Sequence, residues 1–429
     1  MSESPFHLFD VTGVELEYMV VDRETLSVAP IVDQLLTTAD SLARNVPASE
    51  GNPEGDPEFG PIAWSNELAR HVVEFKTAQP VRSLAPVAGL FQENVKRAND
   101  LLAPLNACLL PAAMHPWMDP MKEMQLWPHG YKDVYQAFDR IFSCKGHGWA
   151  NLQSMHINLP FSGDEEFGRL HAAIRLVLPI LPAIAASSPI VEGRTTGLLD
   201  NRLEVYRNNS RRVPSVAGKV IPEPVYTERE YTEQILEKIW KDLSAHDPEG
   251  VLRHEWANAR GCIARFTRGS IEIRVIDVQE CPAADLAICR AVVALVKSLA
   301  NGPLAASGDT AAAMRAAPVD ALHEIFLACV RDADKAVISN MDYLRWLGVS
   351  SSKPLTAGEV WRAVSETLPE DARCSELETI LRHGCLSRRI LRAINPAAAE
   401  KPVSAEVSRD AMKAVYQRLA TCLAQGRMF

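Results

Sequence analysis

What this 429-residue sequence lacks excludes several classes of protein. It has no long unbroken apolar run, since the most hydrophobic stretch, residues 176–191, is too short and too interrupted by proline to cross a bilayer. It has no excess of basic residues: 45 Lys and Arg against 54 Asp and Glu give a net charge of −9, which argues against a nucleic-acid or anionic-membrane surface. Its nine cysteines include no CxxC pair and fit buried, reduced thiols better than a disulfide framework.

Targeting and nucleotide motifs are missing as well. The start, MSESPFHLFD, has no basic stretch followed by an apolar one, so we expect no signal peptide and a cytoplasmic protein. There is no GxxxxGK[ST] motif, and residues 146–151 (GHGWAN) have Asn where a dinucleotide loop needs its third Gly. His323 and Glu324 are not followed by the second His of an HExxH motif. A nucleotide, if one binds, has to be held by another arrangement.

What the chain does have is a strand with two carboxylates close to its N-terminus. In residues 13–22 (GVELEYMVVD), Glu15 and Glu17 alternate with apolar residues. Successive side chains of a strand point to opposite faces, so this pattern predicts one polar and one apolar face. The apolar face is formed by Val14, Leu16 and Tyr18.

Three further predicted strands repeat this design, with apolar residues on one face and two polar groups, two positions apart, on the other. The four polar pairs are Glu15/Glu17, Glu74/Lys76, His156/Asn158 and Glu272/Arg274. If the strands are neighbours in one sheet, its polar face collects four Glu and one His. Carboxylates at close range cannot all stay ionised without cations, and an oxygen-rich set with one imidazole favours Mg²⁺ or Mn²⁺.

Each piece also has a purely structural explanation when it is taken singly. Two Glu in a strand can be the solvated face of a half-exposed sheet, and a lone His in a strand is more often a satisfied core or surface residue. Glu272 and Arg274 could be simple cross-strand ion-pair partners. The joint appearance of all four pairs favours a functional cluster.

The rest of the chain adds helices and two loops to this sheet. Helical spacing is found over 86–105 and 166–186, a Gly/Pro/acid-rich loop over 47–61, and a basic, loop-like stretch over 187–215. From residue 284 onward the pattern is helical, with Thr356 and Glu359 spaced as a capping box. We therefore expect a catalytic sheet with flanking helices over 1–300 and a helical region, 301–429, packed on the same core.

The order of these motifs resembles the glutamate–cysteine ligase type 2 family, a group of carboxylate–amine ligases in the glutamine synthetase superfamily. The resemblance covers about residues 10–300 and is carried by GVELEYMVVD, ELARHVVEFKT, QSMHINLPF, SSPIVEGRTTGLLDNR and GSIEIRVIDVQECPAADLAICRAVVALV. It implies an α+β fold with a curved, mainly antiparallel sheet of the glutamine-synthetase catalytic-domain type, whose concave face holds ATP and two or three Mg²⁺ or Mn²⁺ ions. It also implies small-molecule substrates and allows a homo-oligomer.

By match of position, the resemblance implies six metal ligands: Glu15, Glu17, Glu67, Glu74, His156 and Glu272. Glu15, His156 and Glu272 would share the ion that bridges the ATP phosphates, and Glu17, Glu67 and Glu74 the ion nearer the acceptor carboxylate. Lys76 and Asn158 are candidate ATP- or substrate-binding residues, although Asn158 stands where many relatives have another residue.

The implied chemistry joins an acid to an amine at the expense of ATP. Phosphoryl transfer needs positioning and charge neutralisation, so arginines should assist the metal ions. Arg274 is the first candidate for a phosphate-facing cation; Arg202, Arg194 and Arg265 are the others. The expected product is a γ-glutamyl amide of an amine such as cysteine. The rival functions are a metal-dependent amide hydrolase that needs no ATP and a non-catalytic nucleotide- or metal-binding relative.

Overall fold

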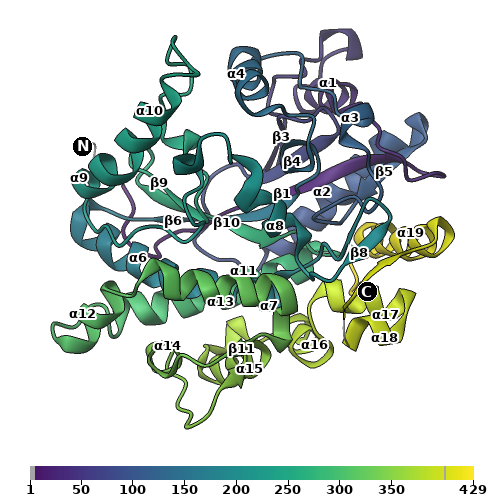
Figure 1. Cartoon of the computed structure of the whole chain (residues 1–429). Helices are drawn as coiled ribbons and strands as arrows, with labels where there is room; N and C mark the ends of the chain where they lie inside the picture. The colour runs from purple at the N-terminus through teal and green to yellow at the C-terminus, as the bar shows by residue number, and fades with distance from the viewer. Residues whose placement is uncertain (1–4, 401) are drawn as a thin grey trace.

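The computed structural model describes residues 5–400 and 402–429, so the first residues of the segment used to judge a signal peptide lie outside it. The chain is a mixed α+β protein built on an open antiparallel sheet, with helices on the sheet's apolar face and a helical C-terminal region (Figure 1). The predicted fold class is therefore confirmed. No helix in the described part of the chain is long and apolar enough to cross a membrane.

Strand β1 is the centre of an eight-stranded sheet in which every pairing is antiparallel. β4 pairs with one edge of β1, while β6 pairs with the first half of the other edge and β5 with its second half. In order, the strands are β2 (Glu58–Phe59), β3 (Ile62–Asn66), β4 (Val72–Thr77), β1 (Gly13–Asp22), β6 (Ser154–Pro160), β10 (Ser270–Asp277) and β9 (Cys262–Arg265), with β5 (Ala107–Leu110) beside β1. Because β1 is bonded along both edges, its register is fixed by three neighbours.

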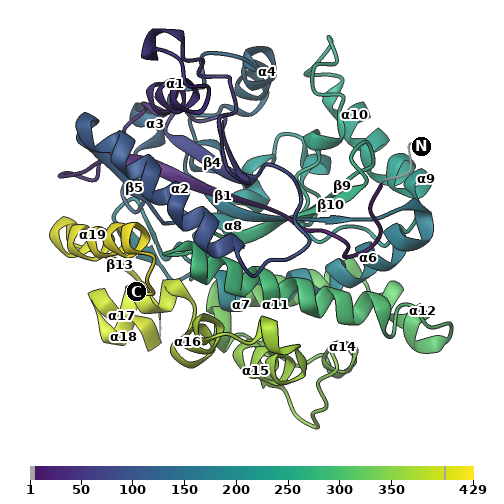
Figure 2. The ribbon, with the colours of Figure 1, turned by 180° about the vertical axis from the view of Figure 1, so that it is seen from behind.

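Three helices cover the apolar face of this sheet: α2 (Val87–Leu102), α6 (Gly163–Val177) and α11 (Pro282–Asn301) (Figure 2). α11 packs against both α2 and α6. Leu16 of β1, Phe91 of α2 and Val292 of α11 belong to one cluster of fully buried side chains. The alternation predicted for residues 13–22 is thus realised, since its apolar residues fill this core and leave the carboxylates on the opposite face.

The C-terminal region packs mainly on helices rather than on the sheet itself. α13 (Val319–Asp332) lies against α7 (Pro182–Ala185) and the short 3₁₀ helix Leu178–Ile180, and α15 (Ala357–Thr367) also contacts α7. Two buried side chains fix this layer: Tyr343 Oη donates to the carbonyl of Leu176 (2.7 Å) and Trp361 Nε1 to that of Ile180 (2.8 Å). α19 (Arg409–Gln425) instead contacts β5 and α2.

The remaining elements connect these layers. The helices are α1 (Val32–Ala43), α3 (Pro120–Glu123), α4 (Lys132–Phe142), α5 (His147–Ala150), α8 (Asn201–Asn209), α9 (Glu228–Tyr231), α10 (Glu237–Leu243), α12 (Asp309–Arg315), α14 (Met341–Trp346), α16 (Ser375–His383), α17 (Leu386–Ile394) and α18 (Pro396–Glu400). The short strands are β7 (Ile190–Val191), β8 (Arg194–Thr196) and β13 (Ser404–Glu406), which form one small sheet, and β11 (Val337–Ile338) with β12 (Leu355–Thr356), which form another.

Local sequence reasoning was wrong in three places. The basic stretch 187–215 is not simply a loop: it contains β7, β8 and helix α8, which begins after Asp200, whose side chain accepts from the amide of Leu203. The region after residue 284 is not entirely helical, because β11, β12 and β13 lie in it. Strands β3 and β5 were missed. Both are short, and each becomes a strand by pairing with a longer one, β3 with β4 and β5 with β1. The predicted capping box of Thr356 and Glu359 is confirmed at the start of α15.

Candidate functional site

The four strands that carry polar pairs are neighbours, in the order β4, β1, β6, β10. The register sets Glu15 opposite Lys76 on one side and His156 on the other, and Glu17 opposite Glu74. On the far side of β6, Asn158 is opposite Glu272. Because side chains alternate along every strand, these groups meet on one face of the sheet.

Direct hydrogen bonds tie the central members of this cluster together. Glu15 accepts from His156 Nδ1 and from Asn158 Nδ2, each at 2.9 Å. Glu17 accepts from both the amide (2.7 Å) and the hydroxyl (2.9 Å) of Ser154, and that hydroxyl lies 2.9 Å from His156 Nε2. The carboxylates of β1 are therefore held in fixed orientations by β6.

Two groups within the cluster have the composition of a cation site. Ligand atoms of Glu15, Glu74 and His156 all lie within 4.8 Å of one another, as do those of Glu17, Glu67 and Glu74. Such oxygen-rich sets with at most one imidazole fit Mg²⁺ or Mn²⁺ better than zinc. Glu74 belongs to both groups.

The second group has the membership that the sequence implied, and the first differs from it. Glu272 was expected beside Glu15 and His156, but its carboxylate is paired with Arg274 Nε (3.1 Å) and Arg265 Nη1 (3.3 Å). One oxygen of Glu272 lies 3.9 Å from His156 Nδ1, so it borders the first group without joining it.

The pKa values of Glu67 and Glu74 are raised because of burial and because negative charges crowd together in the cluster. Burial and the neighbouring Glu17 and Glu74 carboxylates raise the pKa of Glu67 well above its ordinary value. Burial and the charge of Glu15 raise the pKa of Glu74 to about 7, although Lys76 opposes the shift. Burial would raise the pKa of Glu15 too, but the hydrogen bond and the charge of His156 outweigh this effect and lower the pKa of Glu15 to about 2. Bound cations would relieve the repulsion between these side chains, so the residues present fit a divalent ion.

A β-bulge aims Arg274 at this cluster. Ile273 pairs with Ile157 and Ile276 with Met155, so Arg274 and Val275 together oppose the single residue His156. Glu272 and Arg274 remain close enough for the 3.1 Å ion pair. The bulge interrupts the ladder between β10 and β6, and the carbonyl of Arg274 needs a donor from elsewhere.

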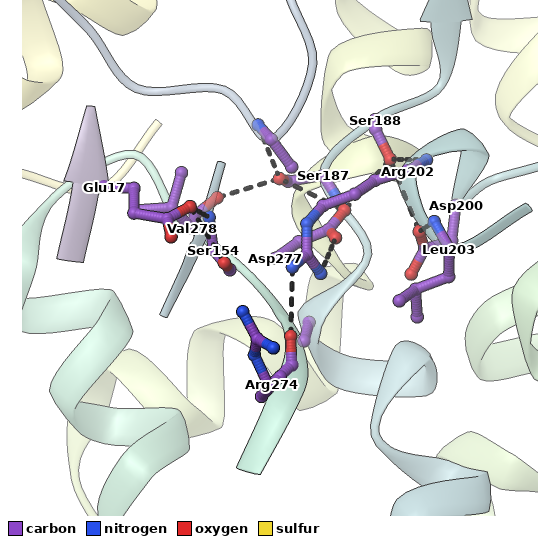
Figure 3. A network of polar contacts seen from close by, with 12 residues as sticks. Glu17, Ser154, Ser187, Ser188, Asp200, Arg202, Leu203, Arg274, Asp277 and Val278 are labelled. Carbon is purple, nitrogen blue, oxygen red and sulfur yellow. Dashed lines mark hydrogen bonds and ion pairs between the residues drawn. The ribbon is translucent and has the colours of Figure 1, made fainter. Parts of the chain in front are cut away.

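Arg202 supplies that donor (Figure 3). Arg202 is 2% exposed, and its guanidinium donates to the carbonyl of Arg274 (3.0 Å) and to Asp277 Oδ1 (3.3 Å). Asp277 is itself fully buried and accepts from the amide of Ser187 (2.8 Å) and the hydroxyl of Ser188 (3.0 Å). Arg202 was predicted to face phosphate, but two of its nitrogens are engaged in holding β10.

Of the other predicted cations, Lys76 and Arg265 lie in the cluster and Arg194 does not. Lys76 Nζ donates to Ser65 (2.8 Å) and lies 3.3 Å from Glu74 Oε1. Arg194 is exposed on β8, in the small separate sheet, and lines neither cavity described below. The prediction placed it here because residues 187–215 were treated as one basic loop.

Two cavities meet at the cluster. The outer one, of about 640 Å³, is lined by Glu15, Glu74, Lys76, Asn158 and the β9–β10 turn at Arg268–Ser270. The inner one, of about 280 Å³, is lined by Glu17, Ser154, Arg202 and several aromatic side chains. Both are lined by Glu67, His156, Arg265, Glu272 and Arg274. The predicted site residues, Arg194 excepted, therefore line one or both cavities, and the five shared residues form a charged partition between the two.

Sequence reasoning missed several lining residues. Ser154 lies on the same strand face as His156 and Asn158, as alternation predicts, but it was assigned no role in the site. The turn at Arg268–Ser270 and the aromatic residues of the inner cavity carry no comparable signal, because their segments reach the site only through the tertiary fold.

Comparisons with known proteins agree with this architecture. An uncharacterised protein of Archaeoglobus fulgidus is 30% identical over 419 residues, which are 97% of this chain and 99% of its own. Relatives that carry provisional glutamate–cysteine ligase 2 names match over 45–67% of this chain, and the matched part is 47–68% of their own length.

Solved structures share the fold at low sequence identity. The glutamate–cysteine ligase of Francisella tularensis, solved in complex with AMP, has a TM-score of 0.58 at 12% identity, covering 96% of this chain and 89% of that one. A bifunctional glutathione synthetase of Pasteurella multocida has a TM-score of 0.55 at 13% identity, covering 96% of this chain and 53% of that one. The model of glutamate–cysteine ligase family 2 matches residues 11–418. The chain belongs to the glutamate–cysteine ligase family 2.

Proposed function

We propose that this protein is an ATP-dependent carboxylate–amine ligase that forms an amide through an acyl phosphate. The observation that carries the proposal is the partition between the two cavities, where two candidate cation sites lie beside Arg274. Family membership supports ligase chemistry, and the AMP bound in the F. tularensis enzyme supports the use of a nucleotide.

The reaction has two steps. A carboxylate oxygen of the acid attacks the γ-phosphorus of ATP, and ADP leaves. The amine nitrogen then attacks the acyl carbon, the bond to phosphate breaks, and the nitrogen loses a proton. The first step needs positioning and neutralisation of phosphate charge more than it needs a protein nucleophile.

In this proposal, Mg²⁺ or Mn²⁺ would be held by Glu15, Glu17, Glu67, Glu74 and His156, with Glu272 at the edge of the set. Divalent ions supply charge neutralisation at the transferred phosphoryl group. Arg274 and Arg265 are fixed by Glu272 and present cationic groups to both cavities, while Lys76 faces the outer one. Asn158 orients Glu15, and Arg202 supports the bulge that aims Arg274.

The outer cavity is the larger and carries Lys76, Arg268 and the β9–β10 turn, which suits the polyphosphate of ATP. The organic substrates then react at the partition. We infer that the acid is glutamate or a similar acid, and that the acceptor is an amine such as cysteine.

The test is an assay of ADP release by the purified chain with ATP, Mg²⁺, glutamate and a panel of amines. ADP release should depend on both the acid and an amine, and should stop when Mg²⁺ is chelated. Formation or cleavage of an amide without ATP would replace the ligase with a metal-dependent hydrolase. ATP binding without turnover for every acid and amine pair would leave only a non-catalytic binder.

A further inference from the structure

The inner cavity has a wall of aromatic rings, part of which lies beside its charged groups. Five aromatic side chains line it: Tyr135, Phe138, Trp149, Tyr206 and Trp256. They come from four separate segments, which are α4, α5, α8 and the 3₁₀ turn Glu255–Ala257. All five side chains are partly exposed. We call this wall the aromatic chamber.

Three of the rings pack together through Phe138, whereas Tyr206 lies beside Arg202, whose Cζ is 5.9 Å from the Tyr206 ring centroid. The Phe138 ring centroid lies 4.9 Å from that of Trp149 and 5.8 Å from that of Trp256. Tyr206 Oη donates to the carbonyl of Arg260 (3.3 Å), and Tyr135 Oη accepts from Asn66 Nδ2 (3.3 Å). Each tyrosine hydroxyl is thus engaged in the protein, so the tyrosines offer the chamber mainly their ring faces.

The other residues that line the inner cavity include both apolar and charged side chains. Leu68, Leu152, Val216, Ala257 and Ile263 add apolar surface, while most of the charged groups belong to the partition with the outer cavity. A molecule in this cavity would therefore meet charged groups, Arg274 among them, and also an apolar surface formed by these apolar residues and the three packed rings. Such a site favours a ligand with one charged, reacting end and an apolar body.

The size of the cavity also favours a ligand with an apolar body. At about 280 Å³ it is close to the lower limit of cavities that hold drug-sized ligands, and it exceeds the needs of a two- or three-carbon side chain. A short polar substrate would leave several rings facing only water.

Resting on the proposed ligase function, we propose that one of the two organic substrates carries an aryl or branched-alkyl group that fills the aromatic chamber, with its reacting carboxylate or amine at the charged partition. The group belongs to the amine or to the acid, and the two arms of the experiment separate these sources. In the first arm, glutamate is paired with 2-phenylethylamine or with ethylamine. In the second, ethylamine is paired with 3-phenylpropionate or with propionate.

One arm should give a kcat/KM for ADP release that is about tenfold or more higher for the phenyl substrate than for its short counterpart. In that arm, Trp256→Ala and Phe138→Ala should reduce the ratio of kcat/KM for the phenyl substrate to kcat/KM for the short one. The reduction should come mainly from a higher KM for the phenyl substrate. Trp240→Ala is the matched control, because Trp240 packs beneath Arg253 on α10, outside the chamber, and should leave the ratio unchanged.

A second measurement needs no turnover. Ligand-observed saturation-transfer NMR should detect the phenyl protons of the preferred probe in the presence of Mg²⁺, and Trp256→Leu should weaken the signal. ADP release that favours the short substrate in both arms, together with no saturation transfer, would overturn the chamber assignment and leave the ligase intact. Phenyl binding that depends on Trp256, with no ADP release from any pair, would overturn the ligase and support the chamber.

Discussion

Replacing Arg202 by alanine should destabilise the protein by an amount that depends on pH. The substitution removes the partner of Asp277, which is fully buried, and the donor to the carbonyl of Arg274. Breaking a buried ion pair from one side costs about 3–5 kcal/mol, and an unsatisfied buried carbonyl about 1–3 kcal/mol. These terms overlap because both groups share one guanidinium, so we expect a total loss of about 3–5 kcal/mol.

The pH dependence follows from Asp277. Burial raises the pKa of this carboxyl, and the charge of Arg202 opposes the rise, so removing Arg202 should raise the pKa further. A carboxyl whose folded pKa exceeds its unfolded value of about 3.9 destabilises the fold increasingly as pH rises, and the cost shrinks when the folded group takes up a proton. The loss in Arg202→Ala should therefore be larger at about pH 8 than at about pH 5.5.

The measurement is urea unfolding of the parent and the variant at both pH values. Arg207→Ala is the matched control: Arg207 lies on the same helix, is only half-buried and is paired with Glu204 three residues earlier, so its loss should stay below about 1 kcal/mol. Equal losses for the two variants, or a loss in Arg202→Ala that does not change with pH, would refute the role assigned to Arg202.

Three further outcomes are expected. Glu272→Gln should reduce ATP-dependent turnover about a hundredfold or more, because it removes the charge that fixes Arg274 and Arg265; Glu165→Gln, at an exposed position, is the control, and equal activity of the two variants would exclude this role. Thr356→Ala should lower the free energy of unfolding by about 1 kcal/mol without altering ADP release, since it removes the N-cap of α15; an unchanged unfolding midpoint would contradict this. Burial lowers the pKa of His71 to about 4, and those of His115 and His171 to about 3, so these side chains are neutral when folded. At these positions the unfolded chain binds protons below about pH 6.5 that the folded chain does not, whereas the raised pKa values of Glu67 and Glu74 act in the opposite direction on the whole chain. The test is therefore a difference: the gap between the urea midpoints of the parent and of His171→Gln should narrow as pH drops from about 7.5 to about 5, and a constant gap would count against it.

The polar face of the sheet was predictable from the sequence because it depends on a local rule. Alternation along one strand assigns Glu15 and Glu17 to one face whatever the rest of the chain does, and the same holds for His156 and Asn158. Four such strands with matching patterns predicted a shared polar cluster on the condition that they are neighbours in one sheet, and the structure meets this condition.

The supports of the site were not predictable in this way. Arg202 looked like a ligand-facing cation, and its bonds to β10 arise from a helix and a bulge that the local pattern did not indicate. Glu67 was predicted as a metal ligand only from the family resemblance, because it follows β3 and is not part of an alternating pattern. The aromatic chamber combines four segments between residues 132 and 257, and only the tertiary fold brings them together.

The position of β1 determines where this chain can change in length. Because β1 pairs with β4, β5 and β6, adding or deleting one residue between Gly13 and Met19 would turn Glu15 and Glu17 into the core and Leu16 towards the cavities. The segment 47–61 carries no such constraint over most of its length, since only its last residues join the sheet at β2. We therefore expect insertions and deletions among homologous chains to be frequent in 47–61 and rare in β1. The two-residue spacing of Glu15 and Glu17 should then be kept where most other parts of the sequence change in length.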